Sequence, residues 1–177
     1  MSSITRVAEK IIIPTPFAVG DVNTYLLKGD ALTLVDAGIK TQEAKEALER
    51  QLKELGYRLS DIEQVILTHH HSDHCGLIDV FQEAPLYGHE DNQRYLKREP
   101  AFTKEQKDYF TSMAKQFGVP PQLMKYANDV ESLYTYSGSK SLTHFLKEGD
   151  WIPGHPGWRA METFGHSQGH LSFYHEE

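Results

Sequence analysis

The chain has 177 residues, of which 39% are hydrophobic and 24% are charged, a composition typical of a folded globular domain and not of a disordered segment. Its 25 acidic and 18 basic residues give a formal net charge of −7, which repels phosphate backbones and argues against nucleic acid as a partner. No apolar run approaches the length needed to span a bilayer, so we expect no membrane-embedded segment.

The N-terminal stretch MSSITRVAEKIIIPTPF contains only a short apolar run and lacks a small-residue cleavage site, so it does not resemble a signal peptide. The single cysteine, Cys75, has no internal partner for a disulfide. Both features predict a cytoplasmic protein.

Residues 10–35 are predicted to form two or three strands joined by hairpins. The segment is apolar and β-branched, turn signals lie at Gly20-Asp21 and Gly29-Asp30, and NTYLL and LTLVDAG are the clearest strands. Thr41 is expected to cap a following helix that ends at Gly56. The apolar positions that share one face of this helix are Ala44, Ala47, Leu48, Leu52 and Leu55.

Strands and helices continue to alternate in the next part of the chain. Ser60-Asp61-Ile62-Glu63 has the pattern of a capping box, and QVILT is a short buried strand that runs directly into a cluster of histidines. A further helix is expected from Gly76 to Phe81, followed by a strand at PLYG and a helix from about Asp91 to Lys97. This alternation predicts a layered α/β fold.

Residues 100–140 are predicted to form a helical insertion. Tyr109, Phe110, Met113 and Phe117 recur at helical spacing, and the helix ends before the Pro120-Pro121 pair. This stripe either packs the helix onto the domain, which is the favoured interpretation, or lines an acyl pocket beneath a lid. Beyond the insertion we expect a strand near residues 159–163, the loop FGHSQGH and a last strand LSFYH.

A dense histidine cluster, Thr68-His69-His70-His71-Ser72-Asp73-His74, follows the predicted strand QVILT. Side chains two residues apart on an extended chain share a face, so His69 and His71 are expected to converge while His70 points away. Several imidazoles and a carboxylate on one loop would be costly to bury or to protonate without a partner, and a bound cation removes that cost. These side chains are ligands for zinc, and also for iron or manganese.

The pattern His69-x-His71-x-Asp73-His74 resembles the signature of the metallo-β-lactamase superfamily. The strands NTYLL and LTLVDAG resemble the opening strands of that family, with Asp36 at its Asp-x-Gly position. The loop FGHSQGH resembles the family's PGHTxGH loop, with Phe164 where proline is common. The resemblance spans nearly the whole chain except the insertion, and it implies an αββα fold that carries one or two metal ions between two β-sheets.

The same resemblance implies roles for individual residues. The implied ligands are His69, His71 and His166 for a first metal ion, and Asp73 and His74 for a second. His170 and Asp36 match positions that support the ligands from behind. Asp73 would also orient the attacking water and act as its proton acceptor or donor.

The implied activity is hydrolysis of an ester, thioester or lactone of a small acyl compound by a metal-activated water, as in the glyoxalase-II-like branch of the family. The absence of an export signal argues against an antibiotic-degrading lactamase, and the acidic charge argues against a nuclease of the same family. Iron-dependent oxidoreductases of the family use the same ligand types. A non-catalytic metal-binding or interaction fragment is the alternative from a different class.

The end of the chain departs from the family pattern. In the family, a Gly-Asp turn whose aspartate bridges the metals and a late histidine follow the second histidine loop, but no aspartate follows Asp150 here, and Glu176 and Glu177 are expected to be solvated. We therefore expect residues 1–177 to be the truncated N-terminal part of one domain, with an incomplete second metal site and low turnover. An exposed apolar face of the first sheet would favour self-association into a homo-oligomer, through exchange of strands between copies.

Four histidines lie outside these patterns. His89, His144 and His155 are expected to be ordinary loop or surface residues. His175 ends the last predicted strand and is expected to be structural.

Overall fold

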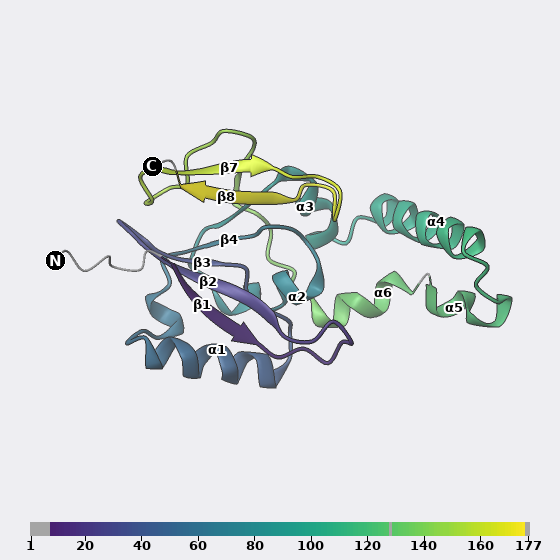
Figure 1. Ribbon diagram of the computed structural model, residues 1–177, viewed down its shortest axis with the longest axis horizontal. Coiled ribbons are helices and arrows are strands. Elements are labelled where there is room, and N and C mark those ends of the chain that lie inside the picture. The colour runs from purple at the N-terminus through teal and green to yellow at the C-terminus, as the bar shows by residue number, and fades with distance from the viewer. Residues whose placement is uncertain (1–7, 128, 176–177) are drawn as a thin grey trace.

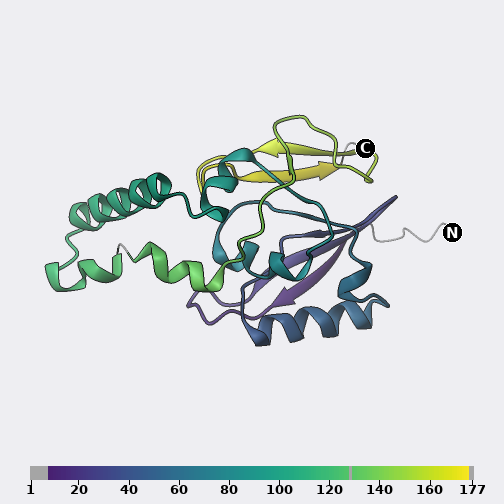
Figure 2. The same cartoon turned by 180° about the vertical axis from the view of Figure 1, so that it is seen from behind.

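The computed structural model describes residues 8–127 and 129–175, so the prediction for Glu176 and Glu177 lies outside the described residues. Two sheets lie one above the other, helix α1 covers the outer face of the larger sheet, and an arm of helices projects to one side (Figures 1 and 2). This is the layered α/β arrangement that the alternation of strands and helices predicts. Within the described residues, no helix is long and apolar enough to cross a membrane.

The larger sheet has six strands in the order β1-β2-β3-β4-β5-β6. They are β1 (Ala8–Ile13), β2 (Val22–Lys28), β3 (Leu32–Val35), β4 (Gln64–Ile66), β5 (Leu86–Gly88) and β6 (His144–Phe145). The first three strands pair antiparallel, and β3 to β6 pair in parallel. Nothing in the sequence pattern predicts β6, because its two residues are too few for a periodic signal.

The parallel pair β3 and β4 fixes the position of the histidine cluster. Val35 is the register partner of Ile66, so the residues that follow both strands emerge at the same edge of the sheet. Asp36 lies directly beyond β3, and its backbone N–H donates to Ile66 O at 2.8 Å. The sequence Asp36-Ala37-Gly38 therefore lies beside the chain that enters the histidine cluster.

The smaller sheet is a hairpin of β7 (Trp158–Glu162) and β8 (Leu171–His175), both of which the sequence predicts. Its inner face closes a core against β4 and the chain that follows β6. The buried residues of that core are Ile66, Leu146, Ile152, Ala160 and Leu171. Met161 and Tyr174, on the alternate positions of the two strands, are each 38% exposed.

The predicted apolar face of the larger sheet is exposed only in part. Tyr87 packs into the core beneath the hairpin, whereas Ile12 on β1 and Tyr25 on β2 are 42% and 40% exposed. The hairpin therefore covers the β4–β5 region and leaves β1 and β2 open on this side. Self-association through this surface stays a prediction.

Helix α1 (Gln42–Glu54) forms where the sequence predicts it. The Thr41 hydroxyl oxygen accepts from Ala44 N at 3.1 Å, which satisfies one of the free N–H groups of the first turn. The chain leaves the helix through Gly56, whose φ of +88° belongs to the left-handed region that glycine adopts most readily. Leu48 and Leu52 are fully buried, and they belong to the same core as Ile11 and Ile13 of β1.

Two short segments differ from the predicted helices. The capping-box pattern at residues 60–63 does not begin an α-helix: a 3₁₀ turn, η1 (Leu59–Asp61), forms instead, and the Asp61 carboxylate accepts from Arg58 N at 2.8 Å. In the second segment, α2 (Ser72–Cys75) begins within the histidine cluster and continues into the 3₁₀ helix η2 (Gly76–Val80). Asp73 and His74 therefore lie on a short helix.

Gly76, at the junction of α2 and η2, lies against the segment that follows Asp36. Its N–H donates to Gly38 O at 2.6 Å, and a Cβ at this position would lie 2.2 Å from Lys40 N. The backbones of the two segments are thus in direct contact, which only glycine permits. Helix α3 (Glu90–Leu96) follows β5 as predicted.

The predicted insertion is helical and forms the projecting arm (Figure 1). It comprises α4 (Pro100–Gln116), η3 (Pro121–Leu123), α5 (Met124–Ala127), α6 (Val130–Leu133) and η4 (Tyr134–Tyr136). The expectation that its aromatic stripe packs onto the domain is wrong: Tyr109 is 60% exposed and Phe117 is 76% exposed. Phe102, near the start of α4, is 1% exposed and contacts the body, because only the base of the arm reaches it.

Candidate metal centre

Three histidines from two distant segments form the one group of metal-ligand side chains found among the described residues. His69 and His71 follow β4, and His166 lies in the loop between β7 and β8. Each offers a ring nitrogen, and the three atoms all lie within 4.8 Å of one another. His69 Nε2 and His71 Nδ1 are 3.1 Å apart, so the two side chains converge as the spacing predicts.

The ring of His69 is oriented by Thr68 and Asp36. The Thr68 hydroxyl lies 2.8 Å from Asp36 Oδ2 and 2.8 Å from His69 Nδ1. Because the carboxylate can only accept, the hydroxyl donates to Asp36 and accepts from His69 Nδ1–H. This leaves a lone pair on His69 Nε2, which faces His71 Nδ1. Two such nitrogens repel each other unless a proton or a metal ion lies between them, so the donor set fits a metal ion.

Both converging imidazoles are held neutral by their surroundings. Burial, and then the neighbouring imidazoles, lower the pKa of His71 to about 3, and the same causes lower the pKa of His69 further. A histidine must be neutral to coordinate a metal ion. The folded protein therefore supplies both side chains as ligands without first removing a proton near neutral pH.

His74 and Asp73 lie on α2, beside this group. His74 Nδ1 donates to Asp36 Oδ2 at 2.8 Å, and this leaves its Nε2 free, 3.6 Å from Asp73 Oδ2. Burial alone would lower the pKa of His74, but the hydrogen bond and charge of Asp36 and the charge of Asp73 together raise it. The rings of His74 and His69 are 4.2 Å apart, so the pair adjoins the three-histidine group, and its assignment to a second metal ion stays a prediction.

Asp36 serves both halves of the site. Its Oδ1 accepts a hydrogen bond from Thr68 N at 2.8 Å, and its Oδ2 accepts hydrogen bonds from the Thr68 hydroxyl and from His74 Nδ1. Its φ of 61° is uncommon for a residue other than glycine, and Asp is among the side chains that tolerate it. The buried Asp36 carboxylate, at the end of β3, thus contacts Thr68, which orients His69 of the first predicted metal site, and His74 of the second.

His170 lies behind the cluster. Its ring is 5.0 Å from that of His69, and its Nδ1 is 2.7 Å from the Thr163 hydroxyl. Leu171 N donates to Thr68 O at 2.8 Å, which joins β8 to the entry of the histidine cluster. Burial and the nearby His166 lower the pKa of His170. The structure places it next to the ligands, as the sequence predicts for a supporting residue.

His70 and Cys75 are turned away from the metal group. His70 Nδ1 is 3.1 Å from Asn92 Oδ1, and its ring packs on Tyr95. The Cys75 thiol donates to His70 O at 3.2 Å, and burial raises the pKa of this thiol to about 12. A protonated thiol is a poor metal ligand, so the cysteine that follows the motif does not compete for the ion.

Two histidines that the sequence assigns to loops or the surface lie in loops but are buried, so a surface position is wrong for both. His155 is 2% exposed, and its Nε2 is 2.6 Å from the Thr33 hydroxyl. His89 is 9% exposed and lies 3.6 Å from Glu162. Both are buried by contacts between segments far apart in the chain, which local pattern does not encode. His144 is exposed, as expected.

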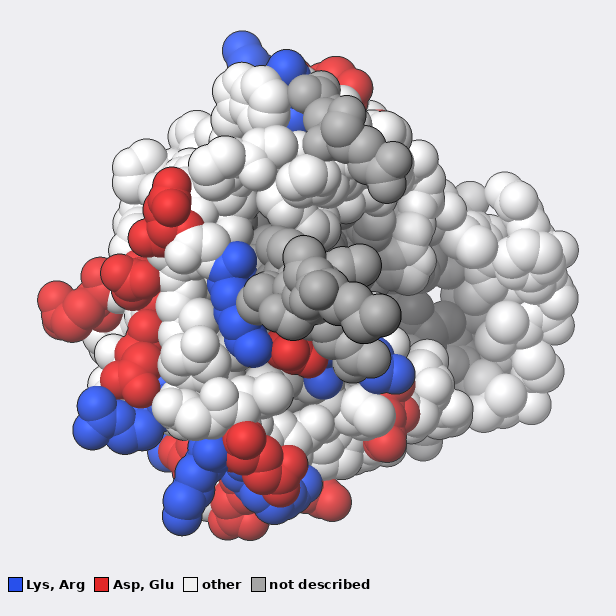
Figure 3. Space-filling model, turned by 60° about the vertical axis from the view of Figure 1, so that its left-hand side comes forward, with Lys and Arg blue, Asp and Glu red and all other residues white. Residues whose placement is uncertain are grey.

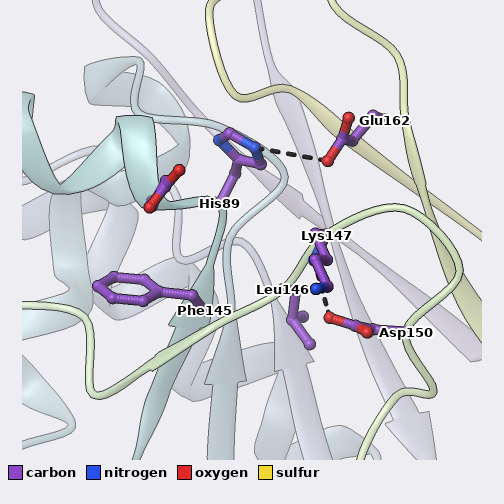
Figure 4. Close-up of a pocket in the computed structure, with 7 residues that line it drawn as sticks. His89, Phe145, Leu146, Lys147, Asp150 and Glu162 are labelled. Atoms are coloured by element: carbon purple, nitrogen blue, oxygen red, sulfur yellow. Dashed lines mark hydrogen bonds and ion pairs between the residues drawn. The ribbon is translucent and has the colours of Figure 1, made fainter.

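A cavity of about 450 Å³ opens on the side of the β7–β8 loop where His89 lies (Figure 4). Its lining residues are His89, Glu90, Phe145, Leu146, Lys147, Asp150 and Glu162. His89 and Glu162 point toward each other across it (Figure 4). The ring of His89 also packs on Phe164, which belongs to the loop that carries His166. The cavity therefore borders the loop that supplies the third histidine.

Two residues of the site have only a weak signal in the sequence. Thr68 directly precedes the histidines, and this position alone suggests that its hydroxyl contacts one of them. Its hydrogen bonds to Asp36 and His69 are seen only in the structure. Asn92 lies within a predicted helix, and nothing in its surroundings marks it. Its contacts with His70 and with Gly169 arise only from the tertiary fold.

Comparison with known sequences identifies the family. A family model described as the metallo-beta-lactamase superfamily matches residues 18–177. "Probable metallo-hydrolase YqjP" of Bacillus subtilis (strain 168) is 48% identical over 168 residues, which are 94% of this chain and 53% of that protein. The chain thus spans about half the length of this relative.

Solved structures agree with the fold. The crystal structure of a metallo-beta-lactamase family protein from Thermus thermophilus matches with a TM-score of 0.75 and 28% identity, covering 97% of this chain and 56% of that one. A beta-lactamase domain protein from Burkholderia ambifaria matches with a TM-score of 0.68 and 21% identity, covering 99% of this chain and 52% of that one. With the family match over most of its length, this chain belongs to the metallo-β-lactamase superfamily.

Proposed function

We propose that this chain binds zinc through His69, His71 and His166 and carries the catalytic metal centre of a hydrolase that cleaves esters, thioesters or lactones. The observation that supports this most directly is the 3.1 Å approach of His69 Nε2 to His71 Nδ1, together with a His166 ring nitrogen in the same group. Three imidazoles leave a coordination position open for water or substrate, as catalytic zinc requires. The similarity to a protein described as a probable metallo-hydrolase supports the same reaction class.

Zinc bound at this position supplies Lewis acidity, which polarises a carbonyl oxygen and favours the ionisation of water. The protein's own contribution to proton transfer is assigned to Asp73. Its side chain is 19% exposed and lies beside His74, so it can reach a water molecule while remaining partly shielded from solvent. We propose that Asp73 orients the attacking water, accepts its proton and passes a proton to the leaving group.

Asp36 and His170 position the ligands in this proposal. Asp36 fixes the tautomer of His69 through Thr68 and the orientation of His74 directly. His170 packs against the ring of His69. Partners that orient a ligand in this way usually contribute about 10–100-fold to metal affinity or activity.

Charge supports a small acyl substrate. The formal net charge is −7, and on the face shown in Figure 3 acidic and basic side chains are interspersed without a continuous basic area. Such a surface attracts polyanions poorly, which argues against a nucleic acid substrate. The role of the α4–α6 arm as a lid over the substrate stays a prediction.

Zinc is the first choice of metal because neutral imidazoles suit it, and iron and manganese accept the same donors. Elemental analysis of the purified chain, grown in medium containing all three metals, would identify the ion. Iron in place of zinc would favour the oxidoreductases of the family over its hydrolases.

The proposal is tested by metal titration and by hydrolysis of a chromogenic ester, thioester and phosphodiester panel. The chain is compared with His71→Ala and with His144→Ala, which changes an exposed histidine outside the group. We expect zinc binding and a low thioester or ester turnover that His71→Ala abolishes and His144→Ala retains. Equal metal binding by the chain and by His71→Ala would refute the site, whereas tight binding without turnover would favour a non-catalytic metal-binding module.

A further inference from the structure

Asn92 on α3 is a fully buried polar side chain that lies outside the predicted ligands, with 0% of its surface exposed. Its amide group makes two hydrogen bonds. Nδ2 donates to Gly169 O at 3.2 Å, and Oδ1 lies 3.1 Å from His70 Nδ1. Because the carbonyl oxygen of the amide can only accept, His70 Nδ1 carries the proton and donates to it.

The two partners of Asn92 belong to the two segments that supply the metal group. His70 lies between His69 and His71, and Gly169 lies in the same loop as His166. Asn92 and Gly169 are 77 positions apart in the chain. A single side chain on a third element, α3, thus holds the His69–His71 segment and the His166 loop at a fixed separation.

The contact between α3 and the His166 loop is close. Gly169 has a φ of +67°, and a Cβ there would lie 2.8 Å from His89 Nδ1 and 3.2 Å from Asn92 Oδ1. Helix α3 is itself anchored, since Tyr95 and Leu96 on it are 3% and 1% exposed. The His166 loop therefore packs closely against a helix that is itself anchored in the core.

A backbone hydrogen bond from Leu171 N to Thr68 O at 2.8 Å also links the same segments, and the ring of His69 contacts that of His166. That hydrogen bond joins the segments next to β8. Asn92 joins them again two residues away, between His70 and Gly169, and does so from a third element, α3. Two hydrogen-bonded attachments restrict the placement of the loop more closely than one.

We propose that Asn92 is a positioning residue of the metal centre, which sets the placement of His166 relative to His69 and His71 by joining His70 to Gly169. The inference rests on the proposed function, since it assumes that these three histidines bind the metal ion. Loss of an outer partner of this kind is expected to weaken metal binding by about 10–100-fold and to alter the geometry of the bound ion.

The test uses cobalt as the probe, because the visible absorption of bound Co²⁺ reports the coordination geometry as well as the affinity. Asn92→Leu keeps the branched shape and the number of heavy atoms of the side chain and removes both hydrogen bonds. His155→Ala is the matched control, because it also removes a buried hydrogen bond but at the other end of the sheet. We expect Asn92→Leu to bind Co²⁺ about 10–100-fold more weakly with a changed spectrum, and His155→Ala to retain the affinity within about twofold and the spectrum of the unaltered chain.

The outcomes separate the two proposals. If the unaltered chain binds no Co²⁺, the proposed metal centre fails, and the role of Asn92 fails with it. If the unaltered chain binds Co²⁺ and Asn92→Leu matches it in affinity and spectrum, only the role of Asn92 is overturned. Should Asn92→Leu not fold, Gly169→Ala displaces the loop from α3 without changing the helix, and an unchanged Co²⁺ spectrum in that variant would equally overturn the inference.

Discussion

Two histidine sites lie at opposite ends of the same pair of parallel strands, β3 and β4. Beyond the carboxyl ends of these strands, His69 and His71 converge with His166. At the other end, His155 packs onto Thr33 and Gln64, which are register partners on β3 and β4. Gln64 Nε2 donates to the Thr33 hydroxyl at 2.7 Å, and the same hydroxyl is hydrogen-bonded to His155 Nε2 at 2.6 Å.

The difference between the two sites lies in what faces the ring nitrogens. His155 Nε2 is hydrogen-bonded to the neutral Thr33 hydroxyl. Gln64 Nε2, which donates to that hydroxyl, also donates to Pro153 O at 2.6 Å. In the metal group, the lone pair of His69 faces another imidazole nitrogen. Burial is similar for His69 and His155, at 2% each, so burial alone does not distinguish a ligand from a structural histidine. The group that faces the ring nitrogen distinguishes the two.

The largest effect is expected from His71→Ala. Removing a direct ligand should lower zinc affinity more than the loss of an outer partner does, hence by more than about 100-fold, and should abolish turnover. The metal-free protein should lose only about 0.5–1.5 kcal/mol of stability, because without a metal ion His71 contributes one hydrogen bond to His69. Calorimetric zinc titration and urea unfolding in the presence of a chelator measure the two quantities. A metal-free variant that unfolds much more easily would assign His71 a structural role.

His155→Ala should give the reverse result. It leaves the Thr33 hydroxyl without its acceptor and opens a cavity, and together these should lower the free energy of unfolding by about 2–4 kcal/mol. Zinc affinity should stay within about twofold of the unaltered chain, as for distant independent sites. Urea unfolding and zinc titration provide the comparison. A tenfold or greater loss of zinc affinity, by about 1.4 kcal/mol or more, would show that the two ends of the sheet are coupled.

Asp36→Asn tests how far the carboxylate supports the metal group. Asn tolerates the left-handed backbone of this position, so the backbone should be little strained. The variant loses the charged acceptor of His74 and of the Thr68 hydroxyl, and zinc affinity should fall by about 10–100-fold. Zinc titration at fixed pH measures this. Unchanged affinity would remove Asp36 from the site.

The pH dependence of stability should be dominated by the metal group. An unfolded histidine binds its proton with a pKa of about 6.5, whereas the pKa of folded His71 is about 3 and that of His69 is lower still. Unfolding therefore takes up protons, and the metal-free protein should lose stability as the pH falls below about 6.5, by up to about 1.4 kcal/mol per pH unit for each such histidine. Burial also lowers the pKa of His155 and adds to the slope.

Urea unfolding of the metal-free protein at several pH values between about 7 and 5 measures this slope, and His71→Ala should make it shallower. A slope that His155→Ala reduces more than His71→Ala does would place the main acid sensitivity at the structural end of the sheet.

Much of this fold can be predicted from the sequence because most of its elements have local sequence signals. The strands β1 to β5, β7 and β8, the cap of α1 at Thr41 and the helical insertion follow from alternation, turn residues and helical spacing. The convergence of His69 and His71, with His70 turned away, follows from the geometry of an extended chain. The family resemblance adds His166, which no local signal connects to them.

What the sequence does not reveal depends on contacts between distant segments. The burial of His155 requires Thr33 and Gln64, and the role of Asn92 requires a loop 77 positions away. The exposure of Phe117 has the same origin, because helical spacing predicts a shared face but not whether another element covers it. In this chain the arm extends away from the body, and most of its aromatic stripe meets solvent.

The buried thiol of Cys75 has a practical consequence. It is the only cysteine in the chain, and its raised pKa keeps it from forming the thiolate that maleimides and methanethiosulfonates attack. A cysteine introduced at an exposed position such as Phe117, at the far end of α4, would therefore take a spin label or fluorophore selectively in the native protein. With a second label on β8, dipolar distances would show whether the arm moves, while Cys75 and the metal-binding motif beside it remain unaltered.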